Sequence, residues 1–231
     1  MRRPIILALD TQDLATAEQW IECTKDSIDV YKVGLEFFLK FGSDGINQLR
    51  RDREFDLFLD LKLHDIPNTV AAAVSSVAHI SPRFLTVHAS GGSAMVKAAA
   101  DIDPSISITA VTILTSLSDE NIADIGYRDG CGESALRLGK LATHNGATSL
   151  VSSPFEASEM RKAVGEKITL ITPGVRPAGS DQGDQSRIMT PVQAISAGAD
   201  YLVIGRPITG FWSTSADAMN QSAAEILESV Q

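Results

Sequence analysis

Eight short apolar runs recur along the chain, and longer amphipathic segments separate them. Within each run the apolar residues are continuous rather than alternating, which is typical of parallel strands that are buried on both faces. The eight predicted strands are residues 5–9, 29–33, 55–61, 84–88, 106–113, 148–152, 168–171 and 201–204. This regular spacing constrains the fold more than any single motif does.

The intervening segments have the pattern of helices. Residues 14–24 and 35–50 carry apolar side chains at three- and four-residue spacing, and residues 91–100 are rich in alanine. Further helices are predicted at residues 133–144, 157–164 and 216–230, where Asn145 and Gly165 are typical terminators of the first two.

Alternating strands and helices predict an α/β protein with a parallel sheet. Eight such units without a change in composition favour one domain over residues 1–231, a closed (β/α)8 TIM barrel. The alternative is an open doubly wound sheet, but no GxGxxG follows the first apolar run.

Composition excludes several classes of protein. A net charge of −9 argues against nucleic-acid binding, although a few local cations could still bind a small anion. Cys23 and Cys131 are too few for a disulfide scaffold and are expected to be reduced thiols. No Cys/His spacing is typical of a zinc site, so no metal is expected.

The apolar run at residues 5–9 raises the question of a signal peptide. The run ends at Asp10, and no small-residue cleavage site follows, so a buried strand is the better interpretation. The uncharged stretch between Asp65 and Arg83 is too polar to span a membrane. We therefore expect a cytoplasmic protein with no membrane partner.

Charged residues stand at the ends of the predicted strands, where barrel enzymes place their active sites. Asp10 and Lys32 end the first two strands, and Asp60 and Lys62 end the third. Asp60 and Lys62 share strand parity, so both should point into the barrel mouth. Neighbouring carboxylates would favour the ammonium form of Lys62, which suits a positioned acid better than a Schiff-base nucleophile. A purely structural salt-bridge network is the alternative.

The loops after the seventh and eighth strands have the composition of a phosphate site. They contain Pro-Gly-Val-Arg at residues 173–176 and Ile-Gly-Arg-Pro at residues 204–207. Glycine lets backbone amides approach an anion, and arginine offers paired donors. Either glycine alone would indicate only an ordinary turn between a strand and a helix. The polar connection at residues 176–187 has the length of a functional lid.

Together these segments resemble the orotidine 5′-monophosphate decarboxylases, in particular the short bacterial branch. The strongest segment is residues 60–69, Asp-Leu-Lys-Leu-His-Asp-Ile-Pro-Asn-Thr. The resemblance extends in order over nearly the whole chain, through residues 7–10, 31–34, 87–90, 114–116, 172–176 and 203–206.

The resemblance implies a carboxy-lyase of de novo pyrimidine synthesis that forms uridine monophosphate without a cofactor. Lys62 would give a proton to C6 of the pyrimidine, and Asp60 would lie beside the substrate carboxylate. Lys32 would hold Asp60 and reach the ribose. Asp65 and Thr69 would enter from the second subunit of a homodimer with shared active sites.

It also implies the contacts that bind the nucleotide. Asp10 would bind a ribose hydroxyl, and Thr115 would bind the pyrimidine ring. The Gly205 amide and Arg206 would grip the phosphate, beside Arg176 of the preceding loop. Gln185 would bridge phosphate and base from the long loop.

Two alternatives remain. A hexulose-phosphate synthase or keto-gulonate-phosphate decarboxylase shares the DxKxxD pattern but stabilises an enediolate on magnesium, and residues 66–69 with Gln185 favour the nucleotide enzyme instead. A non-catalytic phosphate sensor would need the glycine–arginine loops but not the buried charges. His64 and His88 are interpreted as packing residues.

Overall fold

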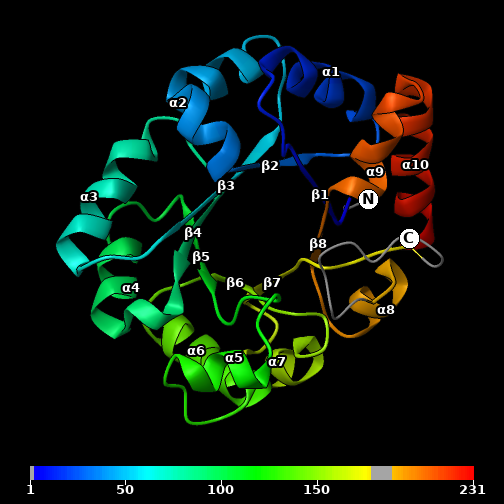
Figure 1. Ribbon diagram of the computed structural model, residues 1–231. Helices are drawn as coiled ribbons and strands as arrows, with labels where there is room; N and C mark the ends of the chain where they lie inside the picture. The colour runs from blue at the N-terminus through cyan, green and yellow to red at the C-terminus, as the bar shows by residue number, and fades with distance from the viewer. Residues whose placement is uncertain (1–2, 178–188) are drawn as a thin grey trace.

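The computed structural model describes residues 3–177 and 189–231. Parallel strands β1 to β8 pair in chain order, and β1 also pairs with β8, so the sheet closes into a barrel (Figure 1). The strands are β1 (Ile5–Ala8), β2 (Val30–Gly34), β3 (Asp56–Leu63), β4 (Phe84–His88), β5 (Ser107–Val111), β6 (Ser149–Val151), β7 (Thr169–Thr172) and β8 (Tyr201–Ile204). The predicted (β/α)8 barrel is confirmed, because an open sheet would leave β1 and β8 apart.

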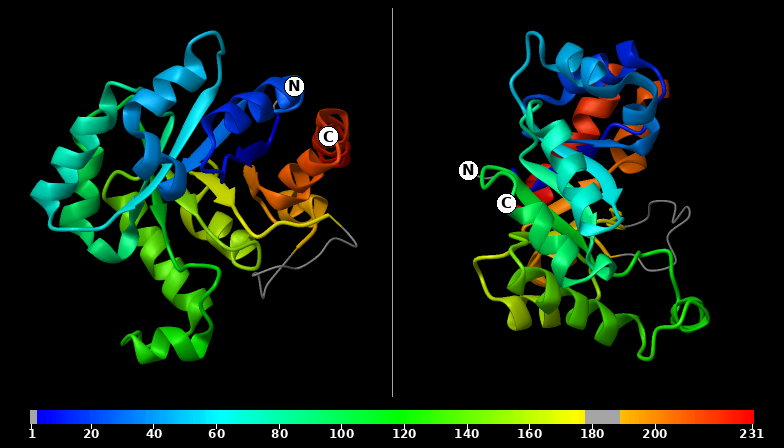
Figure 2. Two further views of the ribbon diagram at one scale, coloured as in Figure 1. Left: turned by 45° about the horizontal axis from the view of Figure 1, so that its top comes forward. Right: turned by 90° about the vertical axis from the view of Figure 1, so that its left-hand side faces the viewer.

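Helices cover the outside of this barrel (Figure 2). They are α1 (Leu14–Thr24), α2 (Leu35–Arg50), α3 (Pro67–Ala78), α4 (Ser93–Ala100), α5 (Asp119–Asp124), α6 (Cys131–His144), α7 (Ala157–Val164), α8 (Pro191–Ser196), α9 (Arg206–Thr209) and α10 (Ala216–Ser229), with 3-10 turns at Ala89–Gly91 and Gly210–Ser213. The predicted helices at residues 14–24, 35–50 and 157–164 match α1, α2 and α7. In the described part of the chain, none of these helices is long and apolar enough to cross a bilayer.

Helix α3 lies in a stretch for which the sequence analysis predicted no helix. Pro67 occupies its first turn, where a missing N–H costs nothing, and Val70, Val74 and Val77 are buried at helical spacing. Alanine and serine between the valines made that pattern weak. Helix α4 also begins later than predicted, because Gly92 has a φ of 87° that no helix accepts.

The short helices α5 and α8 were missed as well. Each begins with a capping box, formed by Ser118 with Asn121 and by Thr190 with Gln193. In this motif the two side chains satisfy backbone N–H groups reciprocally. Thr190 with Gln193 has the usual S/T-x-x-E/Q pattern and could have revealed α8, whereas Asn121 stands where that pattern has Glu or Gln.

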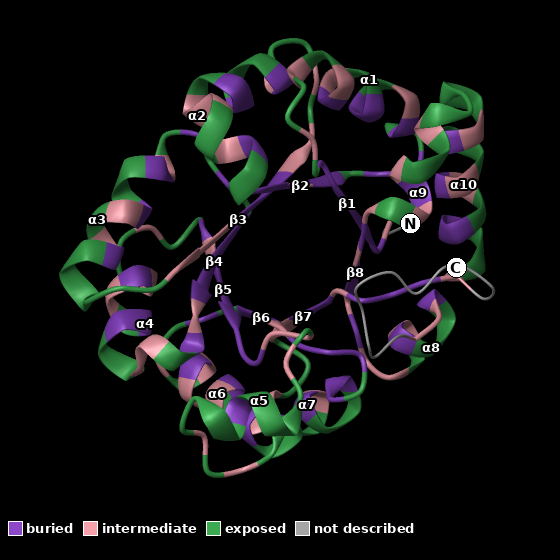
Figure 3. Cartoon of the chain, viewed as in Figure 1, coloured by how far each residue is buried: buried purple, intermediate pink, exposed green. Residues whose placement is uncertain are grey.

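Strand residues divide between two buried layers, and Figure 3 shows the strands buried almost throughout. Alternate residues pack outward against the helices, while an inner cluster fills the barrel: Ile6, Val30, Phe58, Phe84, Ile171 and Tyr201. Two positions further along β2, β3 and β4 come Lys32, Asp60 and Thr86. Strand alternation therefore places a polar layer directly above the apolar one, toward the carboxyl ends of the strands.

Candidate active site

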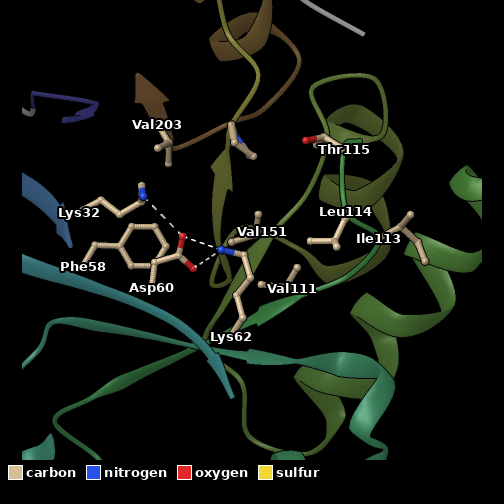
Figure 4. A pocket seen from close by; sticks show the side chains of 11 residues that line it. Lys32, Phe58, Asp60, Lys62, Val111, Ile113, Leu114, Thr115, Val151 and Val203 are labelled. Carbon is tan, nitrogen blue, oxygen red and sulfur yellow. Dashed lines mark hydrogen bonds and ion pairs between the residues drawn. The ribbon is translucent and has the colours of Figure 1, made fainter. Parts of the chain in front are cut away.

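A pocket of about 190 Å³ opens at this polar layer (Figure 4). Its charged side comes from β2 and β3, and its remaining wall is mostly apolar. The lining residues are Lys32, Phe58, Asp60, Lys62, Val111, Ile113, Leu114, Thr115, Val151, Pro173 and Val203. The pocket thus lies at the strand ends where the sequence placed the site.

Four charged side chains form a continuous chain across one side of the mouth. The Lys62 Nζ lies 2.8 Å from both carboxylate oxygens of Asp60. The Lys32 Nζ lies 3.7 Å from Asp60 Oδ2 and 3.0 Å from Asp10 Oδ1. Figure 4 shows the two ammonium groups converging on the Asp60 carboxylate. Because the charges alternate, each one is compensated by a neighbour.

Asp60 is ionised despite its burial. Burial alone raises the pKa of this carboxyl, but the nearby ammonium groups of Lys32 and Lys62 lower it more. Hydrogen bonds from Lys62 and Thr86 act in the same direction, so the pKa of Asp60 lies below its usual value. Asp60 is therefore a fixed negative charge between two lysines at neutral pH.

The β3 backbone is irregular at Lys62. Its pairing with β4 shifts register between Leu59 and Leu63, and Lys62 has a φ of 49°. The Lys62 N–H donates to the Thr86 hydroxyl at 2.8 Å, and that hydroxyl donates to Asp60 Oδ1 at 3.0 Å. The structure brings Asp60 and Lys62 together as strand parity suggested, but through a bulge that alternation does not describe.

Gly34 leaves room for this charged chain. A Cβ on Gly34 would lie 3.2 Å from the Lys32 Nζ, which is closer than most real contacts. A Cβ on Gly205 would make only ordinary contacts, at 3.5 Å from the Ala8 Cβ and 3.9 Å from Asp10 Oδ2. Gly205, just after β8, thus lies beside Asp10, which follows β1. The sequence analysis assigned Gly34 no role.

Asp65 and Thr69 lie apart from the charged chain. Both are exposed, Asp65 just before α3 and Thr69 in its first turn. Asp65 Oδ1 accepts a hydrogen bond from the Ile66 N–H at 2.6 Å. Among the described residues, neither lines the pocket of its own chain. Thr115, by contrast, does line it, on the loop after β5.

The proposed phosphate loops follow β7 and β8, next to the Asp10 end of the charged chain. Gly174 has a φ of 77°, which permits a tight turn after β7. Arg176 is buried, and its Nη1 donates to the Val175 carbonyl at 2.9 Å. Arg206 is exposed at the start of α9. Gln185, with most of the long loop, lies outside the described residues.

His64 and His88 form a ring pair next to Lys62, with centroids 5.4 Å apart and planes at 40°. Burial lowers the pKa of His88, and the charges of His64 and Lys62 lower it further. His88 is therefore neutral at neutral pH. No group of three or more His, Cys, Asp and Glu in residues 3–177 and 189–231 is arranged to hold a metal ion.

Sequence reasoning missed Thr86 and the apolar wall of the pocket. Threonine in a buried strand is common, and only its inward parity beside Asp60 would have drawn attention to it. The apolar wall was missed because valine, like threonine, is common in buried strands; its valines are Val111, Val151 and Val203.

Comparisons with known proteins agree with one another. Residues 3–218 match the model of the family described as orotidine 5′-phosphate decarboxylase / HUMPS. A protein of Thermobifida fusca named orotidine 5′-phosphate decarboxylase is 52% identical over 209 residues, covering 90% of each chain. One of Gluconobacter oxydans with the same name is 45% identical over 216 residues, covering 90% of this chain and 91% of that one. The crystal structure of the enzyme so named from Lactobacillus acidophilus has a TM-score of 0.85 and 34% identity, covering 100% of both chains.

Proposed function

The chain belongs to the orotidine 5′-phosphate decarboxylase / HUMPS family, and we propose that it converts orotidine 5′-phosphate into uridine 5′-phosphate and carbon dioxide in pyrimidine synthesis. This makes it a carboxy-lyase. The observation that carries the proposal is the Lys62 ammonium, held on both oxygens of an ionised Asp60 beside an apolar wall. The names of the curated relatives favour this activity over the sugar-phosphate reactions of similar barrels.

The chemical difficulty lies at C6 of the pyrimidine. When the bond from C6 to the carboxylate breaks, its electron pair stays on C6 in the plane of the ring, where π delocalisation cannot take it up. A fixed positive charge at that carbon lowers the barrier, and preorganised charge is usually the largest catalytic contribution. We infer that Lys62 supplies this charge and then its proton, leaving carbon dioxide and a C6–H bond. The neutral amine regains a proton from solvent.

Asp60 has two roles in this scheme. Its carboxylate holds the Lys62 ammonium through two hydrogen bonds of 2.8 Å, which fixes the donor before substrate arrives. It also places negative charge beside the departing substrate carboxylate. Val111, Val151 and Val203 line the same pocket, and an apolar wall strengthens these interactions because it lowers the local dielectric constant.

The remaining residues are assigned to nucleotide binding. Asp10 and Lys32 would bind the ribose hydroxyls, since they already contact one another at the mouth. Thr115 would contact the pyrimidine, which suits its place in the lining.

The phosphate would lie at the ends of β7 and β8, where Arg206 and the Gly205 amide would grip it together with Arg176 and Gln185. Binding energy gained there, away from C6, can be used to organise the reacting end.

We propose that a second copy completes the site, as a homodimer. Asp65 and Thr69 are exposed and lie off their own pocket, which is what residues acting across a two-fold interface require. Ile66, next to Asp65, is 65% exposed, and such an apolar side chain is suited to burial at that interface.

The experiment is an assay of purified protein for loss of orotidine 5′-phosphate absorbance, run with and without EDTA. We expect turnover that EDTA does not reduce. A requirement for magnesium, together with activity on a sugar phosphate, would instead support the enediolate enzymes of this barrel group.

A further inference from the structure

We propose that Thr86 is a positioning residue for the reaction, because its hydroxyl ties the Lys62 backbone to the Asp60 carboxylate and so sets where the ammonium group lies. The inference rests on the proposed function and adds a residue that does not touch the substrate. Thr86 is fully buried in β4 and is absent from the described lining of the pocket.

The hydroxyl of Thr86 is used in both directions. It accepts a hydrogen bond from the Lys62 N–H at 2.8 Å and donates a hydrogen bond to Asp60 Oδ1 at 3.0 Å. A hydroxyl has one donor and two acceptor sites, so a single group serves both partners. One side chain on β4 therefore joins the main chain of the proton donor to the carboxylate that holds its ammonium.

The backbone at Lys62 needs such a support. A φ of 49° is unfavourable for a residue with a side chain, and it persists only where surrounding contacts hold it. The register shift between Leu59 and Leu63 falls at the same place. There the Thr86 hydroxyl accepts a hydrogen bond from the Lys62 N–H. The hydrogen bond thus stabilises the bulge that directs the Lys62 side chain.

The same hydroxyl acts on the charge of Asp60. Its hydrogen bond is one of the causes that keep the pKa of Asp60 below the usual value. Losing it raises that pKa and frees the carboxylate to turn away from the Lys62 ammonium. Both changes affect the reacting end of the site and leave the phosphate loops unchanged.

Thr86→Val removes the hydroxyl while keeping a β-branched side chain of similar shape. We expect kcat to fall about 10- to 100-fold, since a misplacement of about 1 Å can cost about 100-fold. KM and the affinity for uridine 5′-phosphate should stay within about threefold, because the phosphate grip is untouched. Thr86→Ser, which restores the hydroxyl, should recover most of kcat.

The pH profile separates positioning from simple loss of structure. Because Asp60 must be ionised and Thr86 lowers its pKa, the acid limb of kcat should move to higher pH in Thr86→Val and return in Thr86→Ser. Thr109→Val is the matched control. Thr109 pairs with Thr86 in the sheet and is equally buried, but its hydroxyl bonds Ser107 and Ser149 instead.

Undiminished kcat in a folded Thr86→Val protein would overturn the inference, and so would an equal loss of kcat in Thr109→Val. If Thr86→Val does not fold, Thr86→Ala is measured against the same expectations. Wild-type protein without turnover would overturn the proposed function and this inference with it. Active wild type with an unaffected Thr86→Val would overturn the inference alone.

Discussion

On the β1–β3 side of the barrel mouth, charged side chains project from strand ends and contact one another directly. Asp60 lies within 3.7 Å of both Lys32 and Lys62 and is almost fully buried. On the β7–β8 side, the polar groups stand in loops. Gly174 turns the chain with a positive φ, and Arg206 is exposed at the start of a helix of 4 residues.

This difference suits the roles that we propose for the two sides. A charge that stabilises a transition state has to be held in place before the reaction, which rigid strands with mutual contacts achieve. A phosphate grip has to admit and release the nucleotide, which loops can do. We therefore propose that the strand side carries out the chemistry and the loop side provides affinity, so variants on the two sides should lose different properties.

The largest effect is expected on the strand side, from Lys62→Ala. Removing a general acid typically costs about 10²–10⁴ in rate, and the lost positive charge at C6 adds to this. Affinity for uridine 5′-phosphate should change little. The measurement is kcat by absorbance with binding by calorimetry, and Lys97→Ala, an exposed lysine of α4, is the control. Near-normal turnover of Lys62→Ala would show that the chemistry does not depend on the strand side.

Arg206→Ala tests the loop side. A charge-assisted hydrogen bond contributes about 1.5–3 kcal/mol, so affinity for uridine 5′-phosphate should fall about 10- to 150-fold. Affinity for uridine, which lacks the phosphate, should be nearly unchanged. Arg137→Ala, on the exposed face of α6, serves as the control. Equal losses for both ligands would show that Arg206 does not grip the phosphate.

A mixing experiment asks whether the strand side is complete within one chain. If Asp65 acts in the partner's site, a dimer of one Lys62→Ala chain and one Asp65→Ala chain has one site with both changes and one with neither. Random reassortment makes about half of the dimers mixed, so about a quarter of all sites should be intact. Each variant refolded alone is the control. Mixed dimers without recovered activity would place Asp65 in the site of its own chain.

The smallest effect expected is on stability. The pKa of Asp60 is lower in the folded protein than in the unfolded chain, where it is about 4. The ionised carboxylate therefore stabilises the fold fully at pH values above the unfolded pKa. This stabilisation is lost as the pH falls through the pKa of the folded state. Each unit of lowering contributes about 1.4 kcal/mol. The gap in unfolding free energy between wild type and Asp60→Asn should therefore shrink in acid. A gap for Asp60→Asn that stays constant with pH would contradict the lowered pKa of Asp60.

The strands and their charged ends could be predicted from the sequence. The eight strands could be predicted to within about two residues at each end, because strands buried on both faces have continuous apolar runs. Lys32, Asp60 and Lys62 could be found because charges at the ends of such runs are unusual.

The supporting contacts could not be predicted. A bulge at Lys62 leaves no mark in composition, Thr86 resembles any strand threonine, and the space that Gly34 leaves depends on where the Lys32 side chain lies. Helix α3 was missed because alanine and serine dilute its buried valines.

The most direct test of the central claim uses the product instead of the substrate. If Lys62, held by Asp60, stabilises a C6 carbanion and protonates it, microscopic reversibility requires that the neutral Lys62 amine remove the C6 proton of uridine 5′-phosphate. Incubating the protein with this nucleotide in D2O and following the C6 proton by NMR measures that step. We expect exchange with wild type and none above background with Lys62→Ala. Equal exchange in both, or none with an enzyme that decarboxylates, would contradict it.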